Sequence, residues 1–149
     1  MRTRVFTISV LFSLFVLLAS ASAFAQGDGV EAKIPFDFIA GKKLLPAGDY
    51  TIKRGVEDQR DLLLIRGVDN QEAVFIFAED VRADETPTQS DLVFNQVGDE
   101  YFLSQVWVAG QDIGREIPKP RAERKLEQNL AKSGQPSDDL IHEVRVHTE

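Results

Sequence analysis

The side chains that commonly bind metal ions are few in this chain and are not spaced for that task. His142 and His147 are its two histidines, and a separation of five residues places them together on neither a helix face nor a strand face. Acidic pairs are frequent, but none stands in the D-x-[DN]-x-[DN]-G pattern of a calcium-binding loop; the pairs are Glu79-Asp80, Asp84-Glu85, Asp99-Glu100 and Asp138-Asp139. The sequence therefore predicts no metal site, and we interpret both histidines as solvated residues of the C-terminal tail.

Residues for covalent catalysis or phosphate binding also lack the context that these chemistries need. Ser104 stands in an expected strand, without the G-x-S-x-G turn that exposes a nucleophilic serine. Gly27-Asp28-Gly29 precedes an expected strand, whereas a phosphate-binding glycine loop leads into a helix. A hydrolase with two carboxylates depends on spacing in three dimensions and leaves no sequence motif. We predict no catalytic residue, no cofactor and no enzyme activity, and keep a small glycan hydrolase as an alternative.

Two polar residues and one tryptophan allow a structural and a binding interpretation. Ser104-Gln105 interrupts an apolar strand, and each side chain needs a hydrogen bond because an unsatisfied buried polar group costs about 1–3 kcal/mol. One of them can face solvent while the other bonds the neighbouring backbone. Alternatively, both form the polar floor of a ligand cavity, with Tyr101, Trp107 and Phe75 as its walls. Trp107 is in turn either a core anchor or a stacking platform for a sugar.

Residues 115–132 carry a local excess of positive charge. They contain the acidic residues Glu116, Glu123 and Glu127, against the basic residues Arg115, Lys119, Arg121, Arg124, Lys125 and Lys132. The segment is either the solvated face of a helix or a docking surface for an acidic partner, because opposite potentials steer encounter. An envelope protein or a polysaccharide would be such a partner.

Composition limits the remaining function classes. The chain has 149 residues, a formal net charge of −7 and no cysteine. Nucleic acid and anionic lipid repel a protein of this charge, so neither is expected as a partner. The lack of cysteine excludes disulfides, thiol redox chemistry and thiolate metal sites. We expect one domain that is held together by burial of its hydrophobic core.

The first 25 residues have the three parts of a secretory signal peptide. Two arginines precede an apolar run from Val5 to Leu18, and Ala23-Phe24-Ala25 provides small residues for cleavage before Gln26. The apolar run is shorter than the roughly 20 residues that a membrane-spanning helix needs. We therefore expect residues 1–25 to be removed, the mature chain to be periplasmic or extracellular, and no membrane insertion after cleavage.

Alternation of apolar and polar residues indicates strands in the middle of the chain. Val30 to Phe38 alternates with a period of two, which is typical of a strand with one buried face. Pro35 cannot donate a hydrogen bond to a neighbouring strand, which predicts an edge or a bulge there. Leu92-Val93-Phe94 and Tyr101-Phe102-Leu103 flank a hairpin turn at Gly98-Asp99. Turn signals roughly every ten residues favour a sandwich or a small barrel.

Three segments depart from this strand pattern. The acidic segment from Glu79 to Asp91 is expected to be a surface loop. Arg121 to Lys132 follows Pro120 and has no β-branched residue, which favours a helix. Apolar residues four apart would place one stripe of this helix on the sheet: Ala122, Leu126 and Leu130. We predict a β-domain over residues 26–134 that includes a helix at 120–132, with residues 135–149 as either a flexible tail or a last edge strand.

Several strings of residues are informative as a set: Ile34-Pro35-Phe36-Asp37-Phe38, Leu45-Pro46-Ala47-Gly48-Asp49-Tyr50-Thr51-Ile52, Leu92-Val93-Phe94-Asn95, and Tyr101-Phe102-Leu103-Ser104-Gln105-Val106-Trp107 with Gly114-Arg115-Glu116. Over most of residues 30–126 they resemble a family of small, exported, functionally uncharacterised bacterial proteins of the acidobacterial type. The resemblance implies export and an all-β fold, but no catalytic or binding residue, since that family has no assigned activity. The string from Leu45 to Ile52 alone is similar to the turn and strand of carboxypeptidase-regulatory-like and other Ig-like sandwich modules.

These observations predict an all-β protein, an antiparallel β-sandwich or small barrel of about 7–8 strands with one C-terminal helix. The leading functional hypothesis is an exported, non-catalytic domain with a binding or structural role at the cell envelope. One alternative is a carrier barrel for a small apolar ligand, with a cavity of at least about 300 Å³ lined by Phe75, Phe77, Phe94 and Phe102. The glycan hydrolase alternative predicts two carboxyl groups that face each other across a groove.

Overall fold

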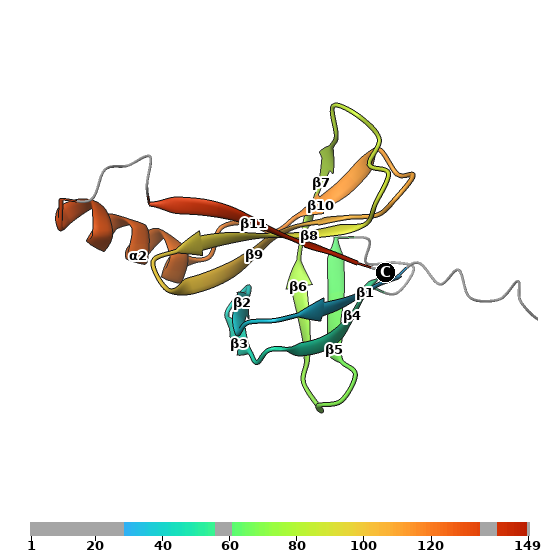
Figure 1. Cartoon of the computed structure of the whole chain (residues 1–149), viewed down its shortest axis with the longest axis horizontal. Helices are drawn as coiled ribbons and strands as arrows, with labels where there is room; N and C mark the ends of the chain where they lie inside the picture. The colour runs from blue at the N-terminus through green and yellow to red at the C-terminus, as the bar shows by residue number, and fades with distance from the viewer. Residues whose placement is uncertain (1–28, 56–60, 135–139, 149) are drawn as a thin grey trace, which may run out of the picture.

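The computed structural model describes residues 29–55, 61–134 and 140–148, so the expected signal peptide, residues 1–25, lies outside the described part of the chain. In the described part, two β-sheets and helix α2 (Arg121–Lys132) make up the regular structure, and neither sheet closes into a barrel (Figure 1). This architecture confirms the predicted all-β fold with one C-terminal helix. Of the two alternatives that the sequence left open, the chain adopts the sandwich.

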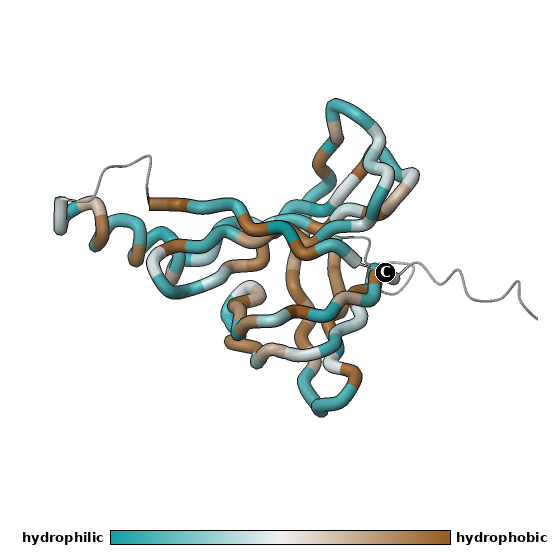
Figure 2. The backbone as a smooth tube through the Cα atoms, viewed as in Figure 1, coloured by the Kyte–Doolittle hydropathy of each residue, from teal (hydrophilic) through white to brown (hydrophobic). Residues whose placement is uncertain are grey.

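The first sheet has four antiparallel strands in the order β1-β4-β5-β6. Its strands are β1 (Gly29–Ile34), β4 (Gly48–Arg54), β5 (Leu62–Gly67) and β6 (Ala73–Phe77). Apolar and polar residues alternate along β1, as Figure 2 shows, and the apolar ones face the core. In β4 the inward side chains are Tyr50 and Ile52. Among the described residues, β6 pairs with β5 on one side only, so it is an edge strand of this sheet.

The second sheet has the order β11-β8-β9-β10-β7 and also holds the short strands β2 and β3 beside β9. Its strands are β2 (Phe38–Ala40), β3 (Lys43–Leu45), β7 (Glu79–Arg82), β8 (Asp91–Val97), β9 (Glu100–Trp107), β10 (Ile113–Glu116) and β11 (Ile141–His147). β8 and β9 form the expected hairpin around Gly98-Asp99, where Gly98 has a φ of 61°. β11 pairs with β8 along its whole length, so the described part of the C-terminal tail is an edge strand.

The strand count exceeds the predicted one by β2, β3 and β7, and two of these, β2 and β7, begin where the chain crosses between the sheets. At residues 35–37 the expected strand from Val30 to Phe38 divides into β1 of the first sheet and β2 of the second, near the irregularity that Pro35 predicted. At Ala78 the chain passes directly from β6 to β7. The prediction of a loop was therefore wrong for Glu79–Arg82. Pairing with β10 makes this segment a strand, although it has no buried face that an alternating pattern could reveal.

Aromatic side chains fill the space between the sheets. The Phe38 ring stands edge-on to those of Tyr50 and Phe94, with centroids 5.2 and 5.5 Å apart, and all three side chains are fully buried. Burial raises the pKa of the Tyr50 phenol. Trp107 is buried too, and a Cβ atom at Gly114 would lie only 2.4 Å from its Cε3 atom. Its indole therefore packs against Gly114 of β10 and has a structural role, although Trp107 lies outside the core cluster between the sheets.

Helix α2 follows Pro120 and contacts β8 of the second sheet. The predicted apolar stripe is only partly buried, because Leu126 and Leu130 are half-buried and Ala122 is exposed. The enclosed side chain is instead Glu123. The stripe prediction was thus wrong for Ala122, whereas Leu130 packs near the β8–β9 turn, with its Cδ1 atom 3.6 Å from where a Cβ atom of Gly98 would lie. Within the described ranges, no helix combines the length and the apolar content that a membrane span requires.

Arg115 of β10 holds the crossing at Ala78. Its side chain is buried, and its Nη2 donates a hydrogen bond to the Ala78 carbonyl oxygen at 2.7 Å. The same guanidinium group pairs with Asp80 and lies 3.9 Å from Oδ1 of Asp61. The Ala78 amide in turn donates to the Asp61 carbonyl oxygen at 2.7 Å. One buried cation therefore joins the last residue before β7 to β5 and β10.

We expect Arg115→Met to lower the free energy of unfolding by about 1–3 kcal/mol, because the buried Ala78 carbonyl loses its side-chain donor. Arg82→Met is the matched control, since the Arg82 side chain is 75% exposed and its Nη2 lies 3.5 Å from Asp112. Loss of such a surface ion pair should cost less than about 1 kcal/mol. Denaturant titration followed by circular dichroism measures both changes, and equal losses in the two variants would contradict this role of Arg115.

Candidate functional site

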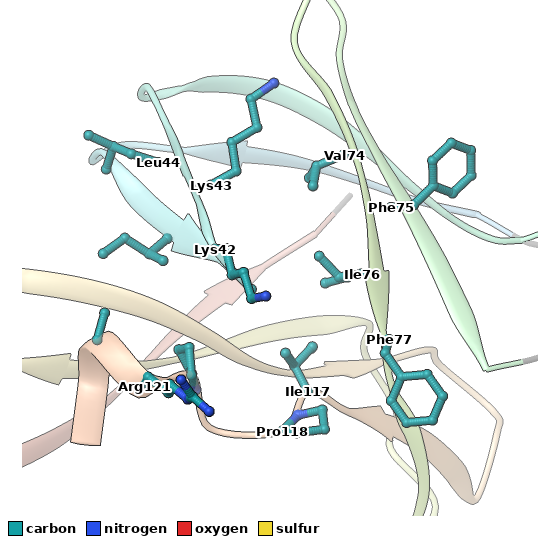
Figure 3. Close-up of a pocket in the computed structure, with 14 residues that line it drawn as sticks. Lys42, Lys43, Leu44, Val74, Phe75, Ile76, Phe77, Ile117, Pro118 and Arg121 are labelled. Atoms are coloured by element: carbon teal, nitrogen blue, oxygen red, sulfur yellow. The ribbon is translucent and has the colours of Figure 1, made fainter. Parts of the chain in front are cut away.

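An apolar groove opens where β6, the β2–β3 hairpin and the start of α2 meet (Figure 3). Its volume is about 1070 Å³. Most of its lining residues are apolar: Ile39, Leu44, Val74, Phe75, Ile76, Phe77, Ile117, Pro118 and Ala122. Three large apolar side chains of this lining are more than half exposed, namely Leu44 at 64%, Phe75 at 61% and Phe77 at 51%. Contiguous exposed apolar surface is unusual on a monomeric protein and is typical of a binding site.

The side chains of β6 alternate between two apolar faces. Val74 and Ile76 point toward the β2–β3 hairpin and Ile117, and they are half-buried and buried respectively. Phe75 and Phe77 lie on the opposite side of the strand, as Figure 3 shows. The strand therefore presents apolar groups on both of its faces, and only one face is covered.

The hydrogen bonds at the two ends of β6 fix the direction of its backbone groups. The Gly67 amide donates to the Glu72 carbonyl oxygen at 2.8 Å, and the Ala78 amide donates to the Asp61 carbonyl oxygen at 2.7 Å. In an antiparallel pair, hydrogen-bonded residues alternate with residues that do not bond across that pair. The even-numbered residues from 72 to 78 therefore bond to β5, and the odd-numbered ones face away from it.

The outward-facing backbone groups of β6 belong to Ala73, Phe75 and Phe77. The carbonyl oxygen of Ala73 accepts a hydrogen bond from Nζ of Lys43 at 3.2 Å, which agrees with this direction. The amide and carbonyl groups of Phe75 and Phe77 extend from the same open edge toward the groove. An open strand edge of this kind is a template on which another strand can pair.

The charged residues that line the groove are all basic. They are Lys42, Lys43 and Arg121, and no acidic residue is among the lining residues of the described chain. Nζ of Lys43 pairs with Oε2 of Glu72 at 2.5 Å. Lys42 and Arg121 are exposed, and neither has an ion-pair partner among the residues that the structure describes. The groove thus combines an apolar lining with two cations that are available to a ligand.

A smaller, polar cleft adjoins the groove at Ile117 and Pro118, which line both. Its volume is about 260 Å³. The polar residues of its lining are Glu79, Asn95, Ser104, Glu116, Lys119 and Glu123. The cleft therefore gathers three carboxyl groups, the residue type that the hydrolase alternative requires.

The enclosed carboxyl group of this cleft is that of Glu123, which is 1% exposed. Nδ2 of Asn95 donates to its Oε1 at 2.8 Å, and Nζ of Lys119 lies 3.9 Å from the same oxygen. Desolvation by burial raises the pKa of Glu123, and the Asn95 hydrogen bond and the Lys119 charge act in the opposite direction. These contacts tie the first turns of α2 to β8, and burial leaves the carboxyl group little access to a substrate.

The polar interruption of β9 has a structural explanation. The Ser104 hydroxyl donates to the Val93 carbonyl oxygen at 3.2 Å, and Oε1 of Gln105 accepts from Nε1 of Trp107 at 3.0 Å. Both side chains thus find partners within their own sheet. Ser104 also lines the polar cleft, whereas neither Gln105 nor Trp107 lines the cleft or the groove.

The four phenylalanines that were expected to line a carrier cavity lie in two different environments. Phe94 and Phe102 are both fully buried, but of these two Phe94 alone belongs to the core cluster between the sheets. Phe75 and Phe77 are exposed on β6. The four rings therefore do not line a common cavity. The sequence could not show this, because residues 73–78 are all apolar and their pattern does not indicate which side chains face inward.

The basic segment of residues 115–132 is not one continuous surface. Arg115 is buried at the sheet crossing, so its expected place on a helix face or docking surface was wrong. Nζ of Lys119 pairs with Oε1 of Glu127 at 2.7 Å, and Nη1 of Arg124 donates to the Lys119 carbonyl oxygen at 2.9 Å. Arg121 is the one helix cation of this segment that lines the groove.

The two histidines lie on β11 and are exposed. Nδ1 of His147 lies 2.6 Å from Oδ1 of Asp91, while no described contact joins His142 to another side chain. In the described ranges, no three histidine or acidic side chains gather closely enough to hold a metal ion.

Comparisons with protein-family models, with curated proteins and with solved structures give no match to this chain. They supply no relative whose functional residues could be transferred. The candidate site therefore rests on the geometry of the groove and of the β6 edge.

We expect the raised pKa of Glu123 to make stability depend on pH. Its ordinary value is 4.5. The folded state holds this proton more tightly than the unfolded state, so the free energy of unfolding falls as the pH rises from below 4.5 through the raised folded-state pKa. Glu123→Gln should lack this decrease, because it cannot ionise and its side-chain oxygen can still accept from Asn95.

Thermal unfolding between pH 4 and pH 8 tests this linkage. Glu127→Gln is the control, since it removes a neighbouring carboxylate from the same Lys119 ammonium group. The difference in melting temperature between wild type and Glu123→Gln should change with pH more than the corresponding difference for Glu127→Gln. The same pH profile in all three proteins would contradict the interpretation.

Proposed function

We propose that this protein is an exported, non-catalytic binding domain that holds an apolar segment of a partner in the groove beside β6, with its role at the cell envelope. The exposed apolar lining carries the proposal. Phe75, Phe77 and Leu44 keep more than half of their surface in water. Burying a side chain of this size stabilises a complex by about 1.5–3 kcal/mol, so an occupant that covers all three gains substantial affinity.

The proposed location rests on the sequence. Residues 1–25 combine a positive start, a short apolar run and small residues before Gln26, as a secretory signal peptide does. A chain without cysteine needs no oxidising step to fold after export, because core burial alone stabilises it. Detection of Gln26 at the N-terminus of the exported protein would support this part of the proposal.

The two alternative functions have less support than groove binding. A carrier barrel would enclose its ligand, but Phe94 and Phe102 are fully buried by protein atoms and the groove is open along β6. A glycan hydrolase needs two accessible carboxyl groups across a groove. In the polar cleft, the enclosed Glu123 is engaged by Asn95 and Lys119. The other two carboxyl groups, those of Glu79 and Glu116, are register partners on adjacent strands of one sheet and do not stand on opposite walls of a groove.

Binding of 8-anilinonaphthalene-1-sulfonate tests the groove. The dye combines apolar rings with one sulfonate, which matches an apolar lining with cations. We expect Phe75→Ser and Phe77→Ser each to raise its dissociation constant about 5- to 30-fold, which corresponds to a loss of roughly 1–2 kcal/mol of apolar contact. Fluorescence titration measures the change.

Val68→Ser is the matched control for this titration. Val68 is 60% exposed and does not line the groove. Circular dichroism of all variants shows whether the fold is retained. If Val68→Ser weakens dye binding as much as the phenylalanine variants do, or if none of the variants changes it, the groove is not the binding site.

A further inference from the structure

We propose that the occupant of the groove is an extended polypeptide segment that adds to β6 as a new strand of the first sheet, with acidic residues at alternate positions. This inference rests on the proposed function and names the class of partner. Three properties of the groove carry it: the direction of the β6 backbone, the alternation of the β6 side chains, and the charge of the lining residues.

The backbone of β6 offers hydrogen bonds that a strand can complete. The amide and carbonyl groups of Phe75 and Phe77 face away from β5, as the hydrogen bonds at the two ends of the strand establish. At Ala73 the outward carbonyl oxygen is already satisfied by Lys43. A small apolar ligand would leave the groups at Phe75 and Phe77 unused, whereas an extended peptide pairs with them.

The side chains of β6 define the two faces of the added strand. On one face, residues of the incoming segment would lie beside Phe75 and Phe77 and extend their exposed apolar surface. On the other face, residues would point into the groove, over Val74 and Ile76 and toward Lys42 (Figure 3). Because side chains alternate along a strand, a segment with apolar and charged residues in alternation suits both faces.

The charge of the groove selects acidic residues for the inner face. Lys42 and Arg121 line it without an ion-pair partner among the described residues, and the lining has no acidic side chain. A glutamate of the incoming strand can cover the apolar floor with its methylene groups and place its carboxylate near either cation. A cationic segment would instead be repelled by both of these residues.

A second copy of this chain is a poorer occupant than an acidic segment. Two β6 strands that paired with each other would place apolar residues, and no carboxylates, against the groove. Each copy also carries a net charge of −7. The lining cations would therefore stay unpaired while the two bodies repelled each other.

The probe is a seven-residue synthetic peptide that alternates valine and glutamate and is capped at both ends. On binding, the amide protons of Phe75 and Phe77 should exchange with solvent at least about tenfold more slowly, since they become hydrogen-bonded. The amide protons of Val74 and Ile76, which already bond to β5, should change little. Hydrogen exchange followed by NMR resolves these four amides.

Two N-methylated versions of the peptide test strand pairing directly. In antiparallel pairing, residues opposite Phe75 and Phe77 share their face and point their own amides at β6, so methylation of the valine amides should abolish binding. Methylation of the glutamate amides, which face solvent, should be tolerated. In parallel pairing the glutamate amides point at β6 instead, so methylation of the glutamate amides should abolish binding and methylation of the valine amides should be tolerated. This outcome also supports strand addition. Equal affinity of both methylated peptides would overturn it.

A pair of protein variants tests the same strand pairing by changing β6 instead of the peptide. Phe75→Pro removes the outward amide donor, while Phe75→Ala removes the aromatic ring and keeps that donor. Proline is tolerated on an edge strand where its nitrogen faces outward. Phe75→Pro should weaken peptide binding at least about tenfold more than Phe75→Ala does. Circular dichroism shows whether both variants fold, and the methylated peptides keep the test valid if Phe75→Pro does not.

Charge selection has its own comparison. A peptide that alternates valine and lysine should bind at least about tenfold more weakly than the valine–glutamate peptide. In the double variant Lys42→Gln/Arg121→Gln, most of this difference in affinity between the two peptides should disappear. Equal affinity of the two peptides would overturn the acidic class of partner. Concentration-dependent dimers that Phe75→Pro abolishes would overturn the inference in favour of a second copy.

The outcomes separate this inference from the function on which it rests. If the dye binds in the groove and the valine–glutamate peptide does not, groove binding stands and strand addition fails. If neither binds, both proposals fail.

Discussion

The direct passage of the chain from β6 to β7 at Ala78 is the constraint on which the rest of this structure depends. No loop separates the two strands, and the buried Arg115 guanidinium group holds the Ala78 carbonyl while it pairs with Asp80 of β7. Because the chain leaves the first sheet at this point, no strand in the described part of the chain after Ala78 pairs with β6. The passage of the chain from the first sheet to the second at Ala78 therefore also leaves β6 as an edge strand of the first sheet.

The groove is a physical consequence of that edge. All residues of β6 are apolar, yet a strand at the side of a sandwich can turn only one of its faces to the core. Val74 and Ile76 take the inner positions, which leaves Phe75 and Phe77 in water. The β2–β3 hairpin and the connection from β10 to α2 come from the second sheet and supply the opposite wall, with Lys42 and Arg121. The apolar exposure is thus built into the topology and does not arise from a single misplaced residue.

The sequence predicted the parts of this fold that depend on near neighbours, and it could not predict those that depend on pairing between distant segments. Alternation revealed β1, and Gly98 revealed the β8–β9 turn, since both signals are local. β7 was missed because its only strand signal is pairing with β10. The carrier alternative placed Phe75 and Phe77 inside a cavity, because a wholly apolar run has no period of two that would identify its inner face. The buried Arg115 and Glu123 were missed for a related reason, since their partners lie 37 and 28 residues away along the chain.

Charge explains how a protein can keep an apolar strand edge without pairing through it indiscriminately. The chain as a whole carries −7, so copies of it repel each other at distances within the Debye length. Along the groove the sign is reversed, because its charged lining residues are Lys42, Lys43 and Arg121. Natural sheets often protect an edge with lysine, and Lys43 does so here by occupying the Ala73 carbonyl. That protection stops before Phe75. The unprotected part of the edge therefore lies where positive potential and apolar surface coincide. A negatively charged extended segment is the occupant for which both electrostatic attraction and burial of apolar surface are favourable.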